Sequence, residues 1–218
     1  MSEQYIFFNS NGIKLEGIFH RNGKNGVVIT HPHPLFGGSM YNNIINLINE
    51  TYLSCGYSTL RFNFRGVGES EGKFDNGDGE IKDLISAFEF MHKQVSDSLH
   101  LAGYSFGSWI NLLALSRIKK EVAVVSIAPP ISFLDFGDVK PDKRIKLIIG
   151  ASDDEYAIAD ILEKTSLSWN KDRNFIKIEK TDHFFSNAEN LLHSALKNFL
   201  ITQIDFQVIP KLSKDLSH

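Results

Sequence analysis

The sequence contains a single cysteine, Cys55, among 218 residues. One cysteine cannot form an internal disulfide, and the shortage excludes a structural zinc site built from cysteine pairs. The N-terminal segment 1–17 has only one apolar run, Tyr5 to Phe8, which is too short for a secretion signal or a membrane span. Together these features favour a reducing compartment, so we expect a cytoplasmic protein.

Basic residues are not in excess, since 23 Lys and Arg stand against 26 Asp and Glu and give a net charge of −3. Binding to a nucleic-acid backbone or an anionic membrane needs a basic surplus, so we expect neither as a partner. Proline and glycine are also few, at 6 and 16, and 42% of the residues are hydrophobic. This composition is typical of a folded globular chain and not of a disordered or fibrous one.

Short apolar runs rich in Val, Ile and Phe alternate with longer segments of helical period between residues 26 and 200. The alternation predicts an α/β fold with a mostly parallel sheet of about eight strands and helices on both faces. Residues 5–8 and 13–19, joined by a turn at 9–12, predict an antiparallel hairpin at one edge. No repeat or linker divides the chain, so we expect one domain over residues 1–218. Its ordered core extends to about residue 200, and a loose tail covers 205–218.

The remaining elements follow from the apolar period. The predicted strands after the hairpin are 26–30, 57–64, 99–102, 122–127, 143–149 and 174–178. The predicted helices are 40–54, 80–95, 105–117 and one that follows Ser186.

The pattern Gly-x-Ser-x-Gly occurs twice, at residues 68–72 and 103–107. A nucleophilic serine in this pattern needs a strand before it, a sharp turn, and a helix after it whose N-terminus faces the developing negative charge. Ser105 has all three. Ser70 lies between two glutamates and leads into a polar loop, so we expect it to be a surface-loop serine. The predicted nucleophile is Ser105.

A serine nucleophile requires a general base and an acid that orients the base. His183 lies between the strand ending near residue 178 and the last helix, which is where chain order places the base. Candidate acids follow the strand that ends near residue 149: Asp153 is the first choice, Asp154 the second and Glu155 the third. Only one of these neighbours can point at the ring. Asp182 adjoins His183 in sequence, and we expect its role to be structural.

The loop at residues 31–38 reads His-Pro-His-Pro-Leu-Phe-Gly-Gly, and its prolines stiffen it. It is a candidate source of the second hydrogen bond to an oxyanion, the first coming from the backbone N–H of Phe106. Since proline has no N–H, the donor is His33, with Leu35 as the second choice. His31 and His33 could instead bind a metal, but no third ligand stands at a suitable spacing, so we predict no metal and no other cofactor.

Tyr104, Phe133 and Phe184 are predicted to line a pocket for the acyl or alcohol part of a substrate, although core packing would also suit these aromatic residues. Twelve residues separate Pro130 from Lys143. That interval is too short for a lid domain, so the predicted site is open.

These motifs together resemble the α/β-hydrolase superfamily. The loop at 31–38, the run at 61–68, the elbow at 103–107 and Asp-His-Phe-Phe at 182–185 are similar to a small, cap-less, dienelactone-hydrolase-like group. The resemblance implies a fold without a cap domain and a triad of Ser105, Asp153 and His183.

The implied reaction is hydrolysis of small esters or thioesters through an acyl-enzyme. The alternatives are a catalytically silent binding or scaffold protein on the same fold, and a peptidase or amidase. The sequence does not indicate an oligomeric state.

Overall fold

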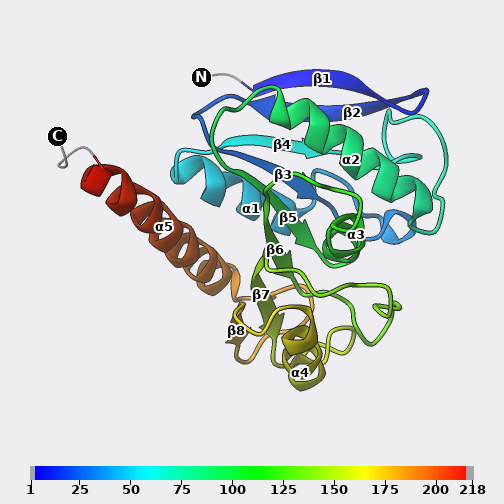
Figure 1. Cartoon of the computed structure of the whole chain (residues 1–218). Helices are drawn as coiled ribbons and strands as arrows, with labels where there is room; N and C mark the ends of the chain where they lie inside the picture. Colours follow the sequence, from blue (N-terminus) through cyan, green and yellow to red (C-terminus); the bar gives the residue numbers. More distant parts are fainter. Residues whose placement is uncertain (1–2, 215–218) are drawn as a thin grey trace.

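The computed structural model describes residues 3–214, and the side chains of residues 3–202. An eight-stranded sheet runs through the centre of the molecule (Figure 1). Its strands lie in the order β1-β2-β4-β3-β5-β6-β7-β8; β2 is antiparallel to both β1 and β4, and the other pairs are parallel. The strands are β1 (Glu3–Ser10), β2 (Ile13–His20), β3 (Gly26–Thr30), β4 (Ser58–Phe62), β5 (Leu99–Tyr104), β6 (Ala123–Ile127), β7 (Ile145–Ala151) and β8 (Asn174–Ile178).

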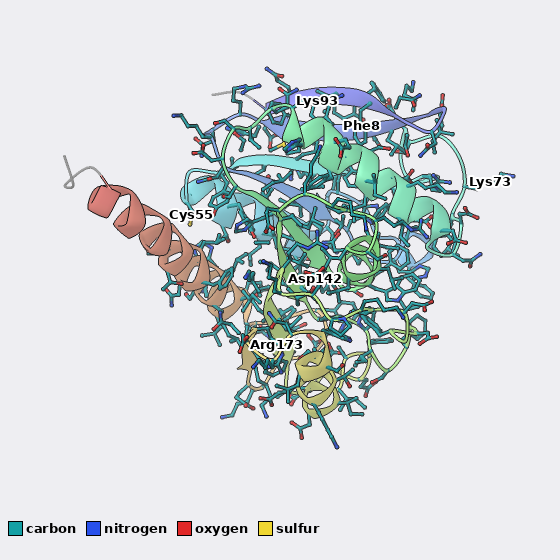
Figure 2. The ribbon with its side chains drawn as sticks, in the orientation of Figure 1. Phe8, Cys55, Lys73, Lys93, Asp142 and Arg173 are labelled. Carbon is teal, nitrogen blue, oxygen red and sulfur yellow. The ribbon has the colours of Figure 1, made fainter. Side chains whose placement is uncertain are left out.

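The predicted hairpin forms the edge of the sheet. Asn11 and Gly12 both have positive φ, 50° and 94°, as a two-residue turn between twisted strands requires. Phe8 of β1 packs on Phe62 of β4 and on Phe90 of the helix above it, with ring centroids 5.7 and 5.9 Å apart. Figure 2 shows Phe8 between the hairpin and this helix, so its ring joins the hairpin to the body of the protein.

Helices cover both faces of the sheet, which confirms the predicted architecture. Helices α2, α3 and α4 lie on the face turned to the viewer in Figure 1, and α1 lies on the other face, where α5 packs against it. Thr51 Oγ1 of α1 and His193 Nδ1 of α5 are hydrogen-bonded at 2.9 Å. The helices are α1 (Asn43–Ser54), α2 (Asp78–His92), α3 (Phe106–Ala114), α4 (Ala159–Trp169) and α5 (Glu189–Lys214), with a short 3₁₀ helix η1 (Pro34–Phe36).

The centre of the sheet is buried on both faces. Every residue of β3, β4 and β5 is buried, including the polar ones. Parallel strands covered by helices on both sides lose the alternation of polar and apolar residues, as in the run Gly-Val-Val-Ile-Thr of β3. None of the helices within residues 3–214 combines the length and hydrophobicity that a membrane span needs.

Helix α5 continues to Lys214, so residues 205–214 of the predicted tail are helical. Residues 215–218 of that prediction lie outside the described residues. A helix that has already begun gains one backbone hydrogen bond for each added residue, even where the apolar period is lost. Figure 1 shows the end of α5 extending away from the sheet.

The carboxyl ends of the parallel strands bring four loops to one edge of the sheet. The loops after β3, β5, β7 and β8 contain His33, Ser105, Asp154 and His183 respectively. Ligand sites of open α/β sheets lie at this edge. The connection 128–144 between β6 and β7 contributes no helix or strand to the described chain, so no cap covers these loops from that direction.

Candidate active site

Ser105 lies at a sharp turn between β5 and α3, with φ at 54° and ψ at −120°. A residue other than glycine is strained at positive φ, and such strain is typical of a nucleophile elbow. The flanking glycines are needed for space. A Cβ on Gly103 would lie 2.6 Å from the backbone of Gly107, and a Cβ on Gly107 would lie 2.3 Å from the carbonyl oxygen of Thr30.

A chain of hydrogen bonds runs from Ser105 through His183 to Asp154. Ser105 Oγ lies 2.9 Å from His183 Nε2, and His183 Nδ1 lies 2.7 Å from Asp154 Oδ2. All three side chains are buried. The other oxygen of the carboxylate, Oδ1, accepts from the backbone N–H groups of Tyr156 and Ala157, each at 2.8 Å. These bonds offset the cost of burying the charge and fix the carboxylate against the ring.

The first choice for the acid, Asp153, is not the residue that reaches the histidine. Asp153 Oδ1 accepts instead from Ser152 Oγ at 2.8 Å, and the side chain is exposed. The backbone N–H of Asp153 donates to the carbonyl of Thr181, so the pairing of β7 with β8 continues past the ends of both strands. The turn inward comes one residue later, so the geometry selects Asp154, the second choice; the third, Glu155, is also exposed.

Two neighbours hold the loop that carries His183. Tyr104 Oη donates to the backbone oxygen of His183 at 2.9 Å, and burial raises the pKa of this tyrosine, so the hydroxyl keeps its proton. Asp182 accepts from the backbone N–H groups of Phe184 and Ser186 and from Ser186 Oγ. The hydrogen bond from the Ser186 backbone is the main cause that lowers the pKa of Asp182. Asp182 therefore has the structural place that the sequence indicated.

Two backbone N–H groups on the wall of the cavity that Ser105 lines have no acceptor among the described residues. They are the N–H groups of His33 and Phe106. The N–H of Leu35, the other candidate donor, is already used, because it donates to His33 Nδ1 at 3.2 Å. The arrangement favours His33 over Leu35 as the partner of Phe106.

His31 fixes the loop that carries His33. Its Nε2 accepts from the backbone N–H of Phe64 at 3.0 Å, which leaves Nδ1 as the donor to the carbonyl of Pro32 at 2.6 Å. Burial lowers the pKa of His31 to about 4, so the ring is neutral. Both ring nitrogens are engaged with backbone, which leaves neither free to bind a metal. Across residues 3–202, no cluster of three or more potential metal ligands occurs.

Ser70, the serine of the other Gly-x-Ser-x-Gly, is buried, and its expected place in a surface loop is wrong. Its Oγ donates to the carbonyl of Asn63 at 2.7 Å and accepts from the N–H of Glu16 at 3.1 Å. The backbone N–H of Glu71 donates to the backbone carbonyl of Lys14 on β2. The polar flanks thus tie this segment to the sheet, and the hydroxyl is used in that structural contact.

A cavity of about 390 Å³ opens in front of Ser105. Tyr104, Phe133 and Phe184, the three predicted pocket residues, lie on its wall. The full lining is Pro32, His33, Phe36, Gly37, Gly38, Asn42, Tyr104, Ser105, Phe106, Pro130, Phe133, Leu134, Tyr156, His183 and Phe184. Phe36 and Tyr156 were not singled out from the sequence, although each lies within three residues of a predicted site residue.

No family model matches the chain. An uncharacterized protein of Rickettsia prowazekii is 30% identical over 210 residues, covering 90% of this chain and 88% of the relative. A crystal structure from Xanthomonas campestris, described as an α/β serine hydrolase without a lid, is 29% identical, with a TM-score of 0.83 over 91% of this chain and 93% of that one.

A putative α/β hydrolase from Agrobacterium tumefaciens is 30% identical, with a TM-score of 0.86 over 94% of this chain and 98% of the other. These likenesses extend over nearly the whole of each chain, and they agree with the eight-stranded sheet and the uncovered site described above. The chain belongs to the α/β-hydrolase superfamily, among its members that lack a lid.

Proposed function

We propose that the protein is a serine hydrolase that cleaves carboxylic esters or thioesters through an acyl-enzyme. The observation that carries the proposal is the continuous hydrogen-bond chain from Ser105 to His183 to Asp154, whose serine end opens into the cavity. The Xanthomonas relative is described as a serine hydrolase, which supports the same class of reaction.

In the first half of the reaction, Ser105 Oγ attacks the carbonyl carbon and His183 Nε2 takes the serine proton. Asp154 keeps the Nδ1 proton on the side away from the serine, which leaves Nε2 free to accept. It also stabilises the imidazolium that forms. The buried carboxylate is suited to this role because both of its oxygens are held by donors.

Negative charge develops on the carbonyl oxygen as the bond to Ser105 forms. The unused N–H groups of His33 and Phe106 are the donors that we assign to this oxygen. Phe106 is the first residue of α3, so the positive end of the helix dipole adds to the stabilisation. Rigid donors of this kind lose little energy to reorganisation during the reaction.

The first half ends when His183 gives its proton to the leaving oxygen or sulfur and the bond from the carbonyl carbon to that atom breaks, so that the alcohol or thiol departs and the acyl-enzyme remains. In the second half, a water molecule attacks the acyl-enzyme, with His183 taking a proton from it. The acid leaves and Ser105 regains its proton. The reaction needs no group outside the chain except water.

A fluorophosphonate probe tests this proposal, because it phosphonylates an activated serine and is read by intact mass. We expect one adduct per chain in the wild type and none in Ser105→Ala. Ser70→Ala is the matched control, since it removes the serine of the other motif, and it is expected to label as the wild type does. A wild-type protein without any adduct would support the alternative of a binding or scaffold protein.

A further inference from the structure

Among residues 3–202, the wall of the cavity carries no Lys, Arg, Asp or Glu side chain. Its polar groups are those already assigned to the reaction, together with Asn42, the His33 ring, the Tyr156 hydroxyl and the Tyr104 hydroxyl, which is bonded to the backbone of His183. The nearest buried carboxylate, Asp154, lies behind the His183 ring and is saturated by three donors. The cavity therefore offers a substrate mostly apolar contact, and no Lys or Arg among its described lining residues can pair with a carboxylate.

Two aromatic rings flank the His183 ring. The centroid of Tyr156 lies 5.1 Å from that of His183, and the centroid of Phe184 lies 5.6 Å from it. Both rings are unusually exposed for their size, 44% for Tyr156 and 57% for Phe184. The leaving group must lie beside His183 Nε2 to receive its proton, so these two rings are placed to contact the alcohol half of an ester.

A third ring lies on the oxyanion side. Phe36 is 73% exposed, and its centroid lies 4.7 Å from that of the His33 ring. With the carbonyl oxygen at the N–H groups of His33 and Phe106 and the leaving group at His183, the acyl chain is directed to the part of the cavity walled by Phe36.

Phe133 lies between the two parts of the cavity. Its centroid is 6.0 Å from that of Phe36 and 6.0 Å from that of Tyr156. It is half-exposed and belongs to the connection between β6 and β7. The aromatic wall is therefore continuous from the acyl side to the alcohol side.

We propose that the site selects esters in which both halves are uncharged and apolar, with Tyr156 and Phe184 binding the alcohol half and Phe36 the acyl half. The inference rests on the proposed function. It disfavours acyl groups that end in a carboxylate, because contact with the aromatic wall removes part of the water around that charge and the described lining has no Lys or Arg to replace it. It also predicts a preference for flat, apolar alcohols, which gain ring-to-ring contact with the exposed aromatic side chains.

The acyl half is tested with p-nitrophenyl pentanoate and p-nitrophenyl hemisuccinate, which have similar length and the same leaving group. After the uncatalysed rates are subtracted, we expect kcat/KM for the pentanoate to exceed that for the hemisuccinate by about 100-fold. Equal values for the two esters would overturn the inference.

The alcohol half is tested with benzyl butyrate and ethyl butyrate, followed by acid release. The ratio of their kcat/KM values should fall about fivefold in Tyr156→Ala and in Phe184→Ala. Phe36→Ala should leave this ratio unchanged and instead reduce the preference for p-nitrophenyl pentanoate over p-nitrophenyl acetate. Tyr5→Ala, which removes an exposed aromatic ring from the edge strand β1, is the control and should change neither ratio.

Different results would overturn the substrate inference and the proposed function. Turnover of the esters with ratios that do not move in the Tyr156 and Phe184 variants would overturn the substrate inference and leave the proposed function standing. No turnover of any ester together with no fluorophosphonate adduct would overturn the proposed function itself. All four truncated residues are at least 44% exposed, so the variants are expected to fold, and circular dichroism checks this.

Discussion

Asp154 and His183 are joined by a hydrogen bond of 2.7 Å between Oδ2 and Nδ1, although they are 29 positions apart in the chain. The contact depends on β7 and β8 lying side by side, because each residue follows one of these strands. It orients the ring so that Nε2 meets Ser105, and it distinguishes Asp154 from the adjacent Asp153.

Asp154→Asn should lower kcat by roughly 10³- to 10⁴-fold, because an amide cannot hold the required tautomer of His183 or stabilise its charged form. Asp153→Asn is the matched control, and we expect its kcat to stay close to that of the wild type. Ester hydrolysis at neutral pH measures both. Equal losses in the two variants would show that the acid lies elsewhere.

His33→Pro removes one backbone N–H at a position whose φ of −56° suits proline. If this N–H stabilises the oxyanion, kcat should fall by about 100- to 1000-fold. His33→Ala keeps the N–H and loses only the ring, so its kcat should fall far less. A similar kcat for the two variants would remove His33 from the oxyanion site.

Gly107→Ala should destabilise the fold, because the new Cβ would lie 2.3 Å from the carbonyl oxygen of Thr30 on the neighbouring strand. We expect the free energy of unfolding in urea to fall by about 3 kcal/mol. Gly150→Ala is the control: the nearest atom to its Cβ is a leucine methyl at 3.4 Å, an ordinary contact. Equal stability of the two variants would contradict this account of the motif.

Stability should fall as the pH drops from about 6.5 towards 4. Burial lowers the pKa values of His31 and His100 to about 4, whereas the unfolded chain takes up these protons near 6.5. Between pH 6.5 and 4 the unfolded state therefore binds more protons than the folded state. Each histidine contributes about 3 kcal/mol to the free energy of unfolding above pH 6.5, and this contribution is lost as the pH falls to about 4. Urea unfolding at several pH values measures the slope. His100→Gln should reduce the slope of unfolding free energy against pH by the equivalent of about one proton. An unchanged slope would contradict the assignment.

Most of the fold could be predicted from the sequence, because the buried parallel strands appear as apolar runs and the glycines mark the turns. Strand β8 was predicted with its observed bounds, and the hairpin follows from the turn at residues 9–12. Helix α4 was missed, since only Ala159, Leu162, Ser166 and Trp169 of its eleven residues are buried. Such a narrow stripe gives a weak period.

The sequence predicts a site residue where the order of strands along the chain determines its position. It does not predict one where a local turn of the backbone determines which neighbour points into the site. Ser105 and His183 follow from their positions after β5 and β8. The choice between Asp153 and Asp154 depends on where the chain turns inward. In the structure, the Asp154 carboxylate accepts from the N–H groups two and three residues later, and the sequence offers such N–H groups to Asp153 as well. The burial of Ser70 depends on contacts with Glu16, 54 residues away, and no local pattern reports them.

Turnover of p-nitrophenyl butyrate by the wild type and by Ser105→Ala tests the central claim most directly. We expect saturable hydrolysis by the wild type with release of p-nitrophenol, and a loss of at least about 10³-fold in kcat when the hydroxyl is removed. Full turnover by Ser105→Ala, measured beside the wild type, would contradict it.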